Sequence, residues 1–454
     1  MRLVVLVLAV VPCTPMCAPP LPPLSRGLPL FGDTLKLLSP KSMASYQVDG
    51  LAKHGPMWRT RLLFQDAVVV TSTDALADLA SEERNKPTFA FFPPQQKALF
   101  GPDSLLVNSG AKHATLRRLV GQALSPAAIA SYAPTIDAAV EECIGRCIEK
   151  SADGDVALAD EMRLFTLRVG AQLILGEVKA RGDIVDTLVE DLSTWSKGLV
   201  APPLFFLPWS AAARARRARR RIEAVLNPLI EDARAGASAV KGGTLLQRLA
   251  RVEDEETGAL EQSAIVDNLL TLLFAGSDTT ASGLTSCFKE LALAPQLQAD
   301  IRNTVATRPA DVVDSTLNAL VAEVHRTNPP APFQVRQVGQ QDLEVGGCCV
   351  PANSLVVYGY AGAMVDSATY TNPSDLDIQR WLSDAALPTW SFGGGPRMCP
   401  GKTLALAETL ALLKRALGPQ GLEWTLTDNQ DLSARYTPGL FPVDRLRARV
   451  GVSK

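Results

Sequence analysis

The run Phe392-Gly-Gly-Gly-Pro-Arg-Met-Cys-Pro-Gly401 holds Cys399 at the end of a glycine-rich loop. From Lys402 onward, leucine and alanine recur at helical spacing, so a helix is predicted to begin beside the sulfur. The positive end of that helix dipole and the nearby Arg397 both favour a thiolate over a thiol. The glycines allow the backbone to approach a flat, bulky group. The stretch therefore predicts a functional thiolate rather than a structural cysteine.

A thiolate in such a loop is suited to bind haem iron as an axial ligand. The spacing of Phe392, Gly395, Arg397, Cys399 and Gly401 resembles the haem-binding signature of the cytochrome P450 superfamily. The resemblance implies a mainly α-helical fold with a minor β-sheet region. Haem b (iron protoporphyrin IX) would lie between a long central helix and the cysteine loop. It also implies that Cys399 is the metal ligand and that Phe392, Gly395 and Arg397 help to bind the cofactor.

The longest predicted helix runs from Ser263, a candidate N-cap, to Ala294, and Pro295 follows as a stop. At 1.5 Å per residue it would span about 48 Å, enough to cross a domain. It is apolar almost all round, which is typical of a buried helix. Its middle holds Ala275-Gly-Ser-Asp-Thr-Thr280, a block that contains several poor helix formers. Residues that disfavour a helix within a predicted helix are expected at functional sites.

This polar block resembles the oxygen-activation motif of the superfamily. By that resemblance Asp278 would gather protons and Thr279 would help to deliver them, so both are predicted as catalytic residues. Ala275 is predicted to contact the substrate. The alternative is a buried helix that merely tolerates a polar patch.

Four basic residues are predicted to meet the haem propionates. His113 and Arg117 lie four apart on one predicted helix, so their side chains project from the same face. Arg336 matches an arginine that the superfamily carries on the strand after the helix-ending prolines, and Arg397 contributes from the cysteine loop. Arginine suits carboxylates because its fork binds both oxygens. On its own, His113 would be interpreted as an ordinary surface or core histidine.

Glu323 and Arg326 lie three apart on a predicted helix, where an acid and a base can pair. The superfamily has a Glu-x-x-Arg pair at this place, joined by a later arginine that Arg380 matches. The resemblance therefore predicts a structural triad. Ile378 and Gln379 depart from the proline and glutamate that the superfamily usually shows here.

Aromatic residues crowd a segment that two prolines interrupt: Phe89, Phe91, Phe92, Pro93, Pro94 and Phe100. The segment is predicted to form an irregular loop over a pocket, with Phe92 against the substrate; the alternative is that these rings fill the core. The segments 27–35, 54–63, 99–118 and 328–336 look most like the retinoic-acid hydroxylases of animals and their cyanobacterial relatives. Those relatives carry two glycines where this chain has Phe333 and Gln334. Phe333 is therefore predicted to narrow the substrate pocket.

Three regions are predicted along the 454 residues: an N-terminal anchor or targeting segment (1–18), a proline-rich hinge (19–32) and a single haem-thiolate catalytic domain (33–454). The apolar run Leu3–Val11 is too short to span a bilayer and fits a cleavable signal or a short anchor. A β-hairpin is predicted over 58–71. The localisation predicted from these features is at a membrane, that of the endoplasmic reticulum, with a plastid or other targeted compartment as the alternative.

The apolar aromatic run Leu204–Trp209 precedes the arginine-rich run Arg214–Arg221. This pattern predicts contact with a membrane surface, with a solvated start of a helix as the alternative. The net charge of −2 gives no reason to expect nucleic acid as a partner. Three histidines leave little room for a multi-histidine metal site.

The resemblance implies a monooxygenase that inserts one oxygen atom from O2 into a small apolar lipid, such as a retinoid, another isoprenoid or a sterol. No flavin or nicotinamide motif is visible, so electrons are expected from an external donor, an NADPH-dependent reductase or a ferredoxin. Arg397, Lys402, Lys414 and Arg415 are predicted to contribute a basic docking face. The alternatives are a reductase-independent haem-thiolate isomerase or dehydratase, and a non-catalytic haem protein that binds a lipid. The acid–threonine pair argues against both.

Overall fold

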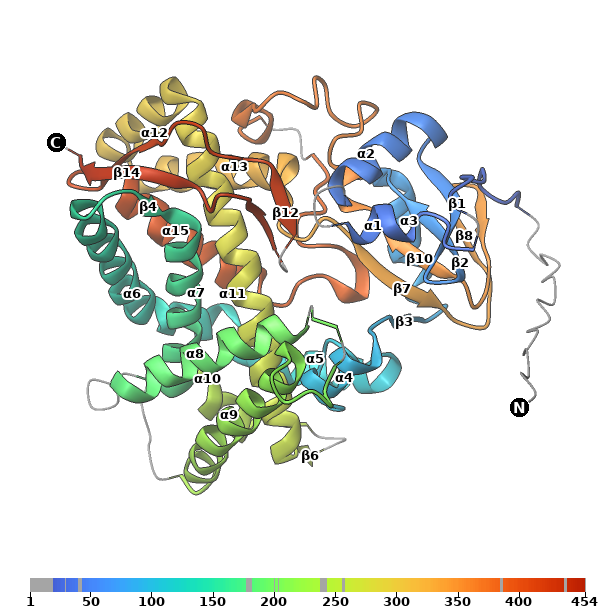
Figure 1. Cartoon of the computed structure of the whole chain (residues 1–454), viewed down its shortest axis with the longest axis horizontal. Helices are drawn as coiled ribbons and strands as arrows, with labels where there is room; N and C mark the ends of the chain where they lie inside the picture. The colour runs from blue at the N-terminus through green and yellow to red at the C-terminus, as the bar shows by residue number, and fades with distance from the viewer. Residues whose placement is uncertain are drawn as a thin grey trace.

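The computed structural model describes residues 19–28, 30–39, 43–176, 182–199, 201–202, 204–236, 243–254, 258–383, 387–436 and 439–453. The predicted anchor or targeting segment, residues 1–18, lies outside the described residues. A large helical body stands beside a smaller part that is rich in strands (Figure 1). The prediction of a mainly α fold with minor sheets is confirmed. Within the described ranges, none of the helices combines the length and hydropathy needed to cross a bilayer.

The helices of the described residues are α1 (Thr34–Leu38), α2 (Met43–His54), α3 (Thr73–Glu82), α4 (Pro94–Phe100), α5 (Gly110–Ala123), α6 (Pro126–Ala152), α7 (Leu158–Leu175), α8 (Gly182–Leu199), α9 (Ala211–Arg234), α10 (Leu245–Arg251), α11 (Gln262–Leu293), α12 (Pro295–Thr307), α13 (Ala310–Thr327), α14 (Tyr360–Ala363) and α15 (Lys402–Leu417). Several begin at the caps that their sequence favours. Ser125 and Ser210 accept the N–H groups of Ala128 and Ala213 at the starts of α6 and α9, for example.

The main sheet has five strands in the order β1-β2-β10-β7-β3. Its strands are β1 (Met57–Leu62), β2 (Gln65–Val70), β3 (Thr88–Ala90), β7 (Gln334–Val338) and β10 (Leu355–Tyr358). β10 runs parallel to β2 and antiparallel to β7. The smaller sheets and hairpins use β4 (Val156–Ala157), β5 (Glu253–Asp254), β6 (Gly258–Ala259), β8 (Leu343–Val345), β9 (Cys348–Val350), β11 (Leu422–Leu426), β12 (Ala434–Tyr436), β13 (Leu440–Pro442) and β14 (Arg447–Val452).

The predicted hairpin is confirmed as β1 and β2, which pair antiparallel with Leu62 opposite Gln65. Leu63 and Phe64 form the two-residue turn, and both have positive φ angles, 50° and 67°. Turns of this kind match the twist of the strands but usually employ glycine or asparagine. Here the Leu63 N–H donates to the Thr34 hydroxyl at 2.9 Å, so contacts from α1 support the turn.

The long central helix α11 passes through the helical body and packs against α7, α13 and α15 (Figure 1). It ends where the sequence predicts, and α12 begins directly at Pro295. The predicted N-cap is wrong, because the helix starts at Gln262 and Glu261 precedes it without a side-chain cap. The Ser263 hydroxyl lies 3.3 Å from a carboxylate oxygen of Asp103 and donates a hydrogen bond to it.

The described part of the proline-rich segment, residues 19–28, lies along the edge of the main sheet. The Ser25 N–H donates to the Arg59 carbonyl at 2.8 Å, and the Arg59 N–H donates to the Pro23 carbonyl at 2.7 Å. These bonds extend the sheet beside β1 over a short distance. Action of residues 19–32 as a hinge stays a prediction.

Candidate active site

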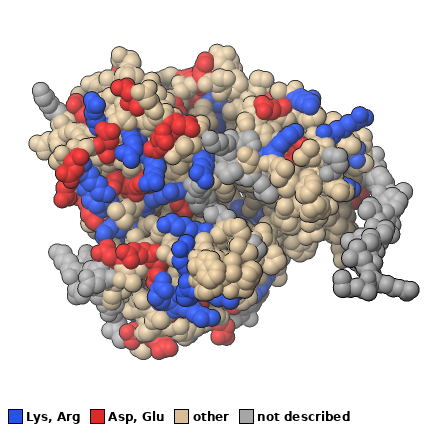
Figure 2. Space-filling view, viewed as in Figure 1, with Lys and Arg blue, Asp and Glu red and all other residues tan. Residues whose placement is uncertain are grey.

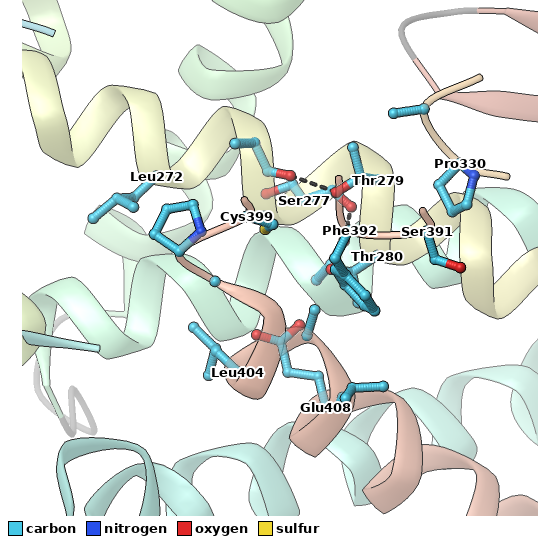
Figure 3. Close-up of a pocket in the computed structure, with 18 of the residues that line it drawn as sticks. Leu272, Ser277, Thr279, Thr280, Pro330, Ser391, Phe392, Cys399, Leu404 and Glu408 are labelled. Carbon is cyan, nitrogen blue, oxygen red and sulfur yellow. Dashed lines mark hydrogen bonds between the residues drawn. The ribbon is translucent and has the colours of Figure 1, made fainter. Parts of the chain in front are cut away.

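A cavity of about 300 Å³ separates α11 from the cysteine loop and α15 (Figure 3). Cys399, Phe392, Thr279, Thr280 and Leu404 all line it. The wall that α11 presents is open: Ala275 and Gly276 are exposed although they sit in the middle of a buried helix. A Cβ built on Gly276 would meet no heavy atom within 4 Å. The two sides of the predicted haem site thus face each other across an apolar space.

The loop before Cys399 depends on glycine at two positions. Gly393 and Gly395 have φ angles of 68° and 61°, which residues with a side chain rarely adopt. Gly395 packs against Ala80 of α3, where a Cβ would lie 2.9 Å from the Ala80 Cβ. Gly395 is not among the described residues that line the cavity. It therefore shapes the loop rather than the cavity wall. The Cys399 N–H donates to the Phe392 carbonyl at 2.8 Å and closes the turn.

The surroundings of the Cys399 sulfur act in opposite directions on its pKa. Burial raises the pKa of the Cys399 thiol above its ordinary value, and the backbone N–H groups of Gly401 and Lys402 and the charge of Arg117 offset only part of that rise. The N-terminus of α15 therefore acts to lower the pKa of Cys399, as the sequence predicts. The expectation that Arg397 favours the thiolate is corrected, because its guanidinium turns toward α5. There it donates to the Asn108 carbonyl at 2.8 Å and the Ser109 hydroxyl at 2.9 Å.

The four predicted propionate-binding residues come together from three separate parts of the chain. His113 and Arg117 lie on α5, Arg336 lies on β7, and Arg397 lies in the short turn Gly395–Arg397. Burial, followed by the charges of Arg397, Arg117 and Arg336, lowers the pKa of His113 to about 3. Arg336 is almost fully buried, and its Nε has no hydrogen-bond partner among the residues that the structure describes.

A buried cluster of three guanidinium groups, with an unsatisfied donor and one carboxylate partner at Arg336, is costly unless further anions join it. The two propionates of haem b are anions of the required kind, and arginine binds carboxylates well. The residues present therefore fit the haem that the cysteine loop predicts. We call these four residues the basic cradle.

The structure places the two predicted catalytic residues on different sides of α11. Thr279 lines the cavity with Cys399, and its hydroxyl donates to the Ala275 carbonyl at 2.5 Å (Figure 3). Asp278 lines a second cavity of about 860 Å³ between α7, α8 and α11. Ser277 lines both spaces. The acid and the alcohol are thus neighbours in the chain that face separate compartments.

Asp278 has a partner that sequence reasoning missed. The Arg163 Nε on α7 donates to the Asp278 carboxylate at 3.1 Å, and the Arg163 guanidinium lies 3.8 Å from the centre of the Phe441 ring. Burial raises the pKa of Asp278, and the charge and hydrogen bond of Arg163 oppose that rise. The two residues lie 115 positions apart, so no local pattern could have revealed the pair.

The predicted structural triad is present and buried. The Arg326 Nε and Nη2 bind the two carboxylate oxygens of Glu323 at 2.9 and 2.8 Å, and the Arg380 Nε donates to the same carboxylate at 3.1 Å. The Trp381 indole N–H adds a further bond to Glu323 at 2.8 Å. These partners offset the cost of burying the Glu323 carboxylate, and they lower its pKa from the usual value. The departures at Ile378 and Gln379 leave this network intact.

Two of the three predicted substrate-binding residues line the cavity. Ala275 lines it from α11, and Phe333 lines it just before β7, with its ring 6.4 Å from that of Tyr436. Phe92 is not among the described lining residues; its ring packs edge-on against Phe100 at 6.0 Å.

The loop around Phe92 is also shorter in the structure than the sequence predicts. Phe89 belongs to β3, where it pairs with Gln337, and α4 begins at Pro94. Only three residues, 91–93, lie between these two elements. Of the aromatic residues in this segment, Phe100 is buried in the core, Phe92 is partly buried against it, and Phe89 is exposed.

Glu408 is a buried residue of the cavity wall that lies outside the sequence motifs described above. It lies on α15, and its carboxyl points away from that helix toward α11 (Figure 3). Because it is buried, its pKa is raised to about 8. A signal existed in the sequence, since Glu408 is an acid within an otherwise apolar helical run beside the cysteine loop.

We expect Glu408 to make folding stability fall as the pH rises. An unfolded glutamate loses its proton near pH 4.3, whereas folded Glu408 keeps it to about pH 8. Between these values the folded state binds the extra proton, so raising the pH favours unfolding. Glu408→Gln should flatten this decline in the free energy of unfolding, measured by denaturant titration from pH 5 to 8. Glu149→Gln, at an exposed site, is the control, and equal slopes for both variants would contradict the assignment.

Comparisons with known proteins agree with this geometry. The family model described as Cytochrome P450 matches residues 22–439. Abscisic acid 8'-hydroxylase 1 of Oryza sativa subsp. japonica is 28% identical over 447 residues, which cover 95% of this chain and 90% of that protein. Cytochrome P450 26A1 of Danio rerio is 26% identical over 456 residues, with coverage of 95% and 90%.

A solved structure is also similar over the whole length. The structure of a retinoic acid-bound cyanobacterial CYP120A1 superposes with a TM-score of 0.81 at 27% sequence identity. The match covers 96% of this chain and 100% of the other.

Proposed function

Because this chain belongs to the cytochrome P450 family, we propose that it hydroxylates an apolar isoprenoid, either a retinoid or a smaller terpenoid acid. It is a haem-thiolate monooxygenase that uses O2 and electrons from a redox partner. The relatives named for abscisic acid and retinoic acid support an isoprenoid substrate. A single observation carries the proposal: the apolar cavity places the Cys399 loop opposite the polar block of α11.

The chain's own residues account for how haem b would be held. Cys399 would ligate the iron as a thiolate, Phe392 would contact the cofactor, and the basic cradle would bind the propionates. When bound, haem supplies the activation of O2. The apolar lining, which includes Leu272, Leu273 and Leu404, would exclude water from this space and orient an apolar substrate.

Asp278 and Thr279 would together carry protons across α11. The second cavity gives Asp278 its own compartment, and Arg163 holds the carboxylate in place. Thr279 stands on the reaction side, where its hydroxyl can exchange its bond to the Ala275 carbonyl for one to a bound water. Such a path requires a proton acceptor on one side of the helix and a donor on the other, which this pair provides.

For the electron donor we propose an NADPH-dependent reductase or a ferredoxin that docks beside the cysteine loop. Met398, next to Cys399, is exposed, so the sulfur lies just beneath the surface there. The predicted basic face needs correction: Lys414 is paired with Asp314, and Arg415 with Glu141. Arg397 points inward to α5. Lys402 is the remaining cation of that set beside the loop, 5.7 Å from the Phe392 ring centre.

A membrane surface is the second proposed partner. Phe206 and Trp209, in the loop between α8 and α9, are 76% and 70% exposed. Figure 2 shows uncharged surface in this region with Lys and Arg side chains beside it. Exposed aromatic rings bordered by cations fit the boundary of a bilayer with anionic lipid heads. Part of the arginine-rich run is already paired within the protein, as Arg221 is with Asp191, so fewer of its cations are available to lipid than the sequence predicts.

The proposed substrate class is tested by spectral titration of the haem-loaded protein. We expect retinoids or terpenoid acids to displace haem-bound water and shift the absorption band, whereas sterols should bind more weakly. Phe333→Gly removes the ring that narrows the cavity, so affinity for bulky ligands should rise roughly tenfold, about what burial of a few methylene groups contributes. Phe89→Ala, at an exposed ring outside the cavity, is the control. No response to any isoprenoid, or equal affinities in both variants, would contradict the proposal.

A further inference from the structure

Glu83 is a carboxylate beside the basic cradle to which no role has been assigned so far. It directly follows α3, and its side chain is only 4% exposed. The Arg336 Nη1 donates to its Oε1 at 2.9 Å and to the Thr88 hydroxyl at 3.1 Å, and that hydroxyl donates in turn to Glu83. Glu83, Thr88 and Arg336 therefore form a closed, buried hydrogen-bonded group.

The charge of Glu83 also acts on the next member of the cradle. Burial is the main cause that lowers the pKa of Arg397 to about 10, and the charges of Arg336 and Arg117 add to it. Glu83 opposes these causes. The Tyr358 hydroxyl lies in the same region, and burial together with the charge of Glu83 and a hydrogen bond to it raises its pKa.

The charges of the basic cradle and of Glu83 can be compared with those of the two propionates of haem b. Arg117, Arg336 and Arg397 are guanidinium ions, and burial together with their charges lowers the pKa of His113. Glu83 is the carboxylate in contact with the cradle. Glu83 therefore offsets one of the three guanidinium charges, and the other two remain to pair with the two negatively charged propionates. Without Glu83 the buried site would carry one positive charge in excess.

We propose that Glu83 is a positioning residue that holds Arg336 and balances the basic cradle against the haem propionates, and that it thereby lowers the haem reduction potential. Reduction adds an electron at the iron, and a fixed negative charge in a low-dielectric interior disfavours that step. This inference rests on the proposed haem site. It concerns a residue outside the cysteine loop, the polar block of α11 and the four predicted cradle residues.

The test is a redox titration of haem-loaded, substrate-free protein followed by absorption spectroscopy. In Glu83→Gln, the ratio of ferrous to ferric haem at a fixed solution potential should rise roughly three- to tenfold over wild type. Thr88→Val removes the hydroxyl of the same group but keeps both charges, so the ratio should change less than about twofold. Glu82→Gln is the matched control, because Glu82 is the preceding residue and pairs with Lys86 away from the cradle. Its ratio should equal that of wild type.

Equal ratios in Glu83→Gln and Glu82→Gln would overturn the inference. If Glu83→Gln does not retain haem, Glu83→Asp decides, because it keeps the charge on a shorter side chain. Retention of haem with a near wild-type ratio in Glu83→Asp supports the charge role, and loss of haem in both variants assigns Glu83 to packing and overturns it. A wild-type protein that shows no thiolate-ligated haem would instead contradict the proposed function itself.

Discussion

Cys399→Ser is expected to abolish monooxygenase activity and to reduce haem retention strongly. A serine hydroxyl has a far higher pKa than a thiol, so the backbone N–H groups of Gly401 and Lys402 cannot stabilise an oxyanion there as they do a thiolate. The substitution changes one atom, and the turn that the Phe392 carbonyl closes should persist. The measurement is the haem-to-protein absorbance ratio after purification, together with product formation in the presence of a reductase.

Cys348→Ser provides the matched control for this prediction. Cys348 is a half-buried free cysteine on β9 that does not line the cavity. It should keep wild-type haem content and turnover. Full haem content and activity in Cys399→Ser would show that another group ligates the iron.

Asp278→Asn is expected to slow turnover by about 10²-fold, the usual contribution of a general acid or base. Asparagine keeps the shape of the side chain and a hydrogen-bond acceptor for Arg163, but it cannot take up and release a proton. Substrate binding should change little, because Asp278 faces the second cavity rather than the one with Cys399. The measurement is kcat, with the affinity for substrate determined separately by spectral titration.

The same assay separates the acid from the alcohol. Thr279→Ala should still consume electrons but divert them to hydrogen peroxide, because the hydroxyl on the reaction side is lost. Thr285→Ala is its control: the Thr285 hydroxyl makes the same bond to the carbonyl four residues earlier, at 2.7 Å, but is fully buried away from the cavity. Wild-type turnover in Asp278→Asn, or tight coupling in Thr279→Ala, would remove that residue from the proton path.

Local sequence patterns were sufficient to predict the elements that depend on the spacing of neighbouring residues. The long helix, the β1–β2 hairpin and the helix after the cysteine loop all appear at the predicted places. The superfamily signature also placed distant residues together, as in the triad of Glu323, Arg326 and Arg380, because it carries information about tertiary contacts that spacing alone lacks.

The remaining features depend on contacts between distant segments. Arg163 reaches Asp278, and Glu83 reaches Arg336, across more than 100 residues in each case. The N-cap of α11 is Glu261 rather than Ser263, and the Ser263 hydroxyl binds Asp103 instead of capping the helix. The contact between the Phe92 and Phe100 rings is likewise not set by spacing, because aromatic side chains are as suited to a core as to a pocket wall, and a role of Phe92 in substrate binding stays a prediction.

Ligation of haem iron by Cys399 is tested by the absorption spectrum of the wild-type protein after reduction and addition of carbon monoxide. If Cys399 binds the iron as a thiolate, the main band should show the strong red shift that distinguishes thiolate-ligated from histidine-ligated haem. The cysteine loop, the basic cradle and the cavity all predict this result. A spectrum like that of a histidine-ligated globin in freshly purified protein would contradict it.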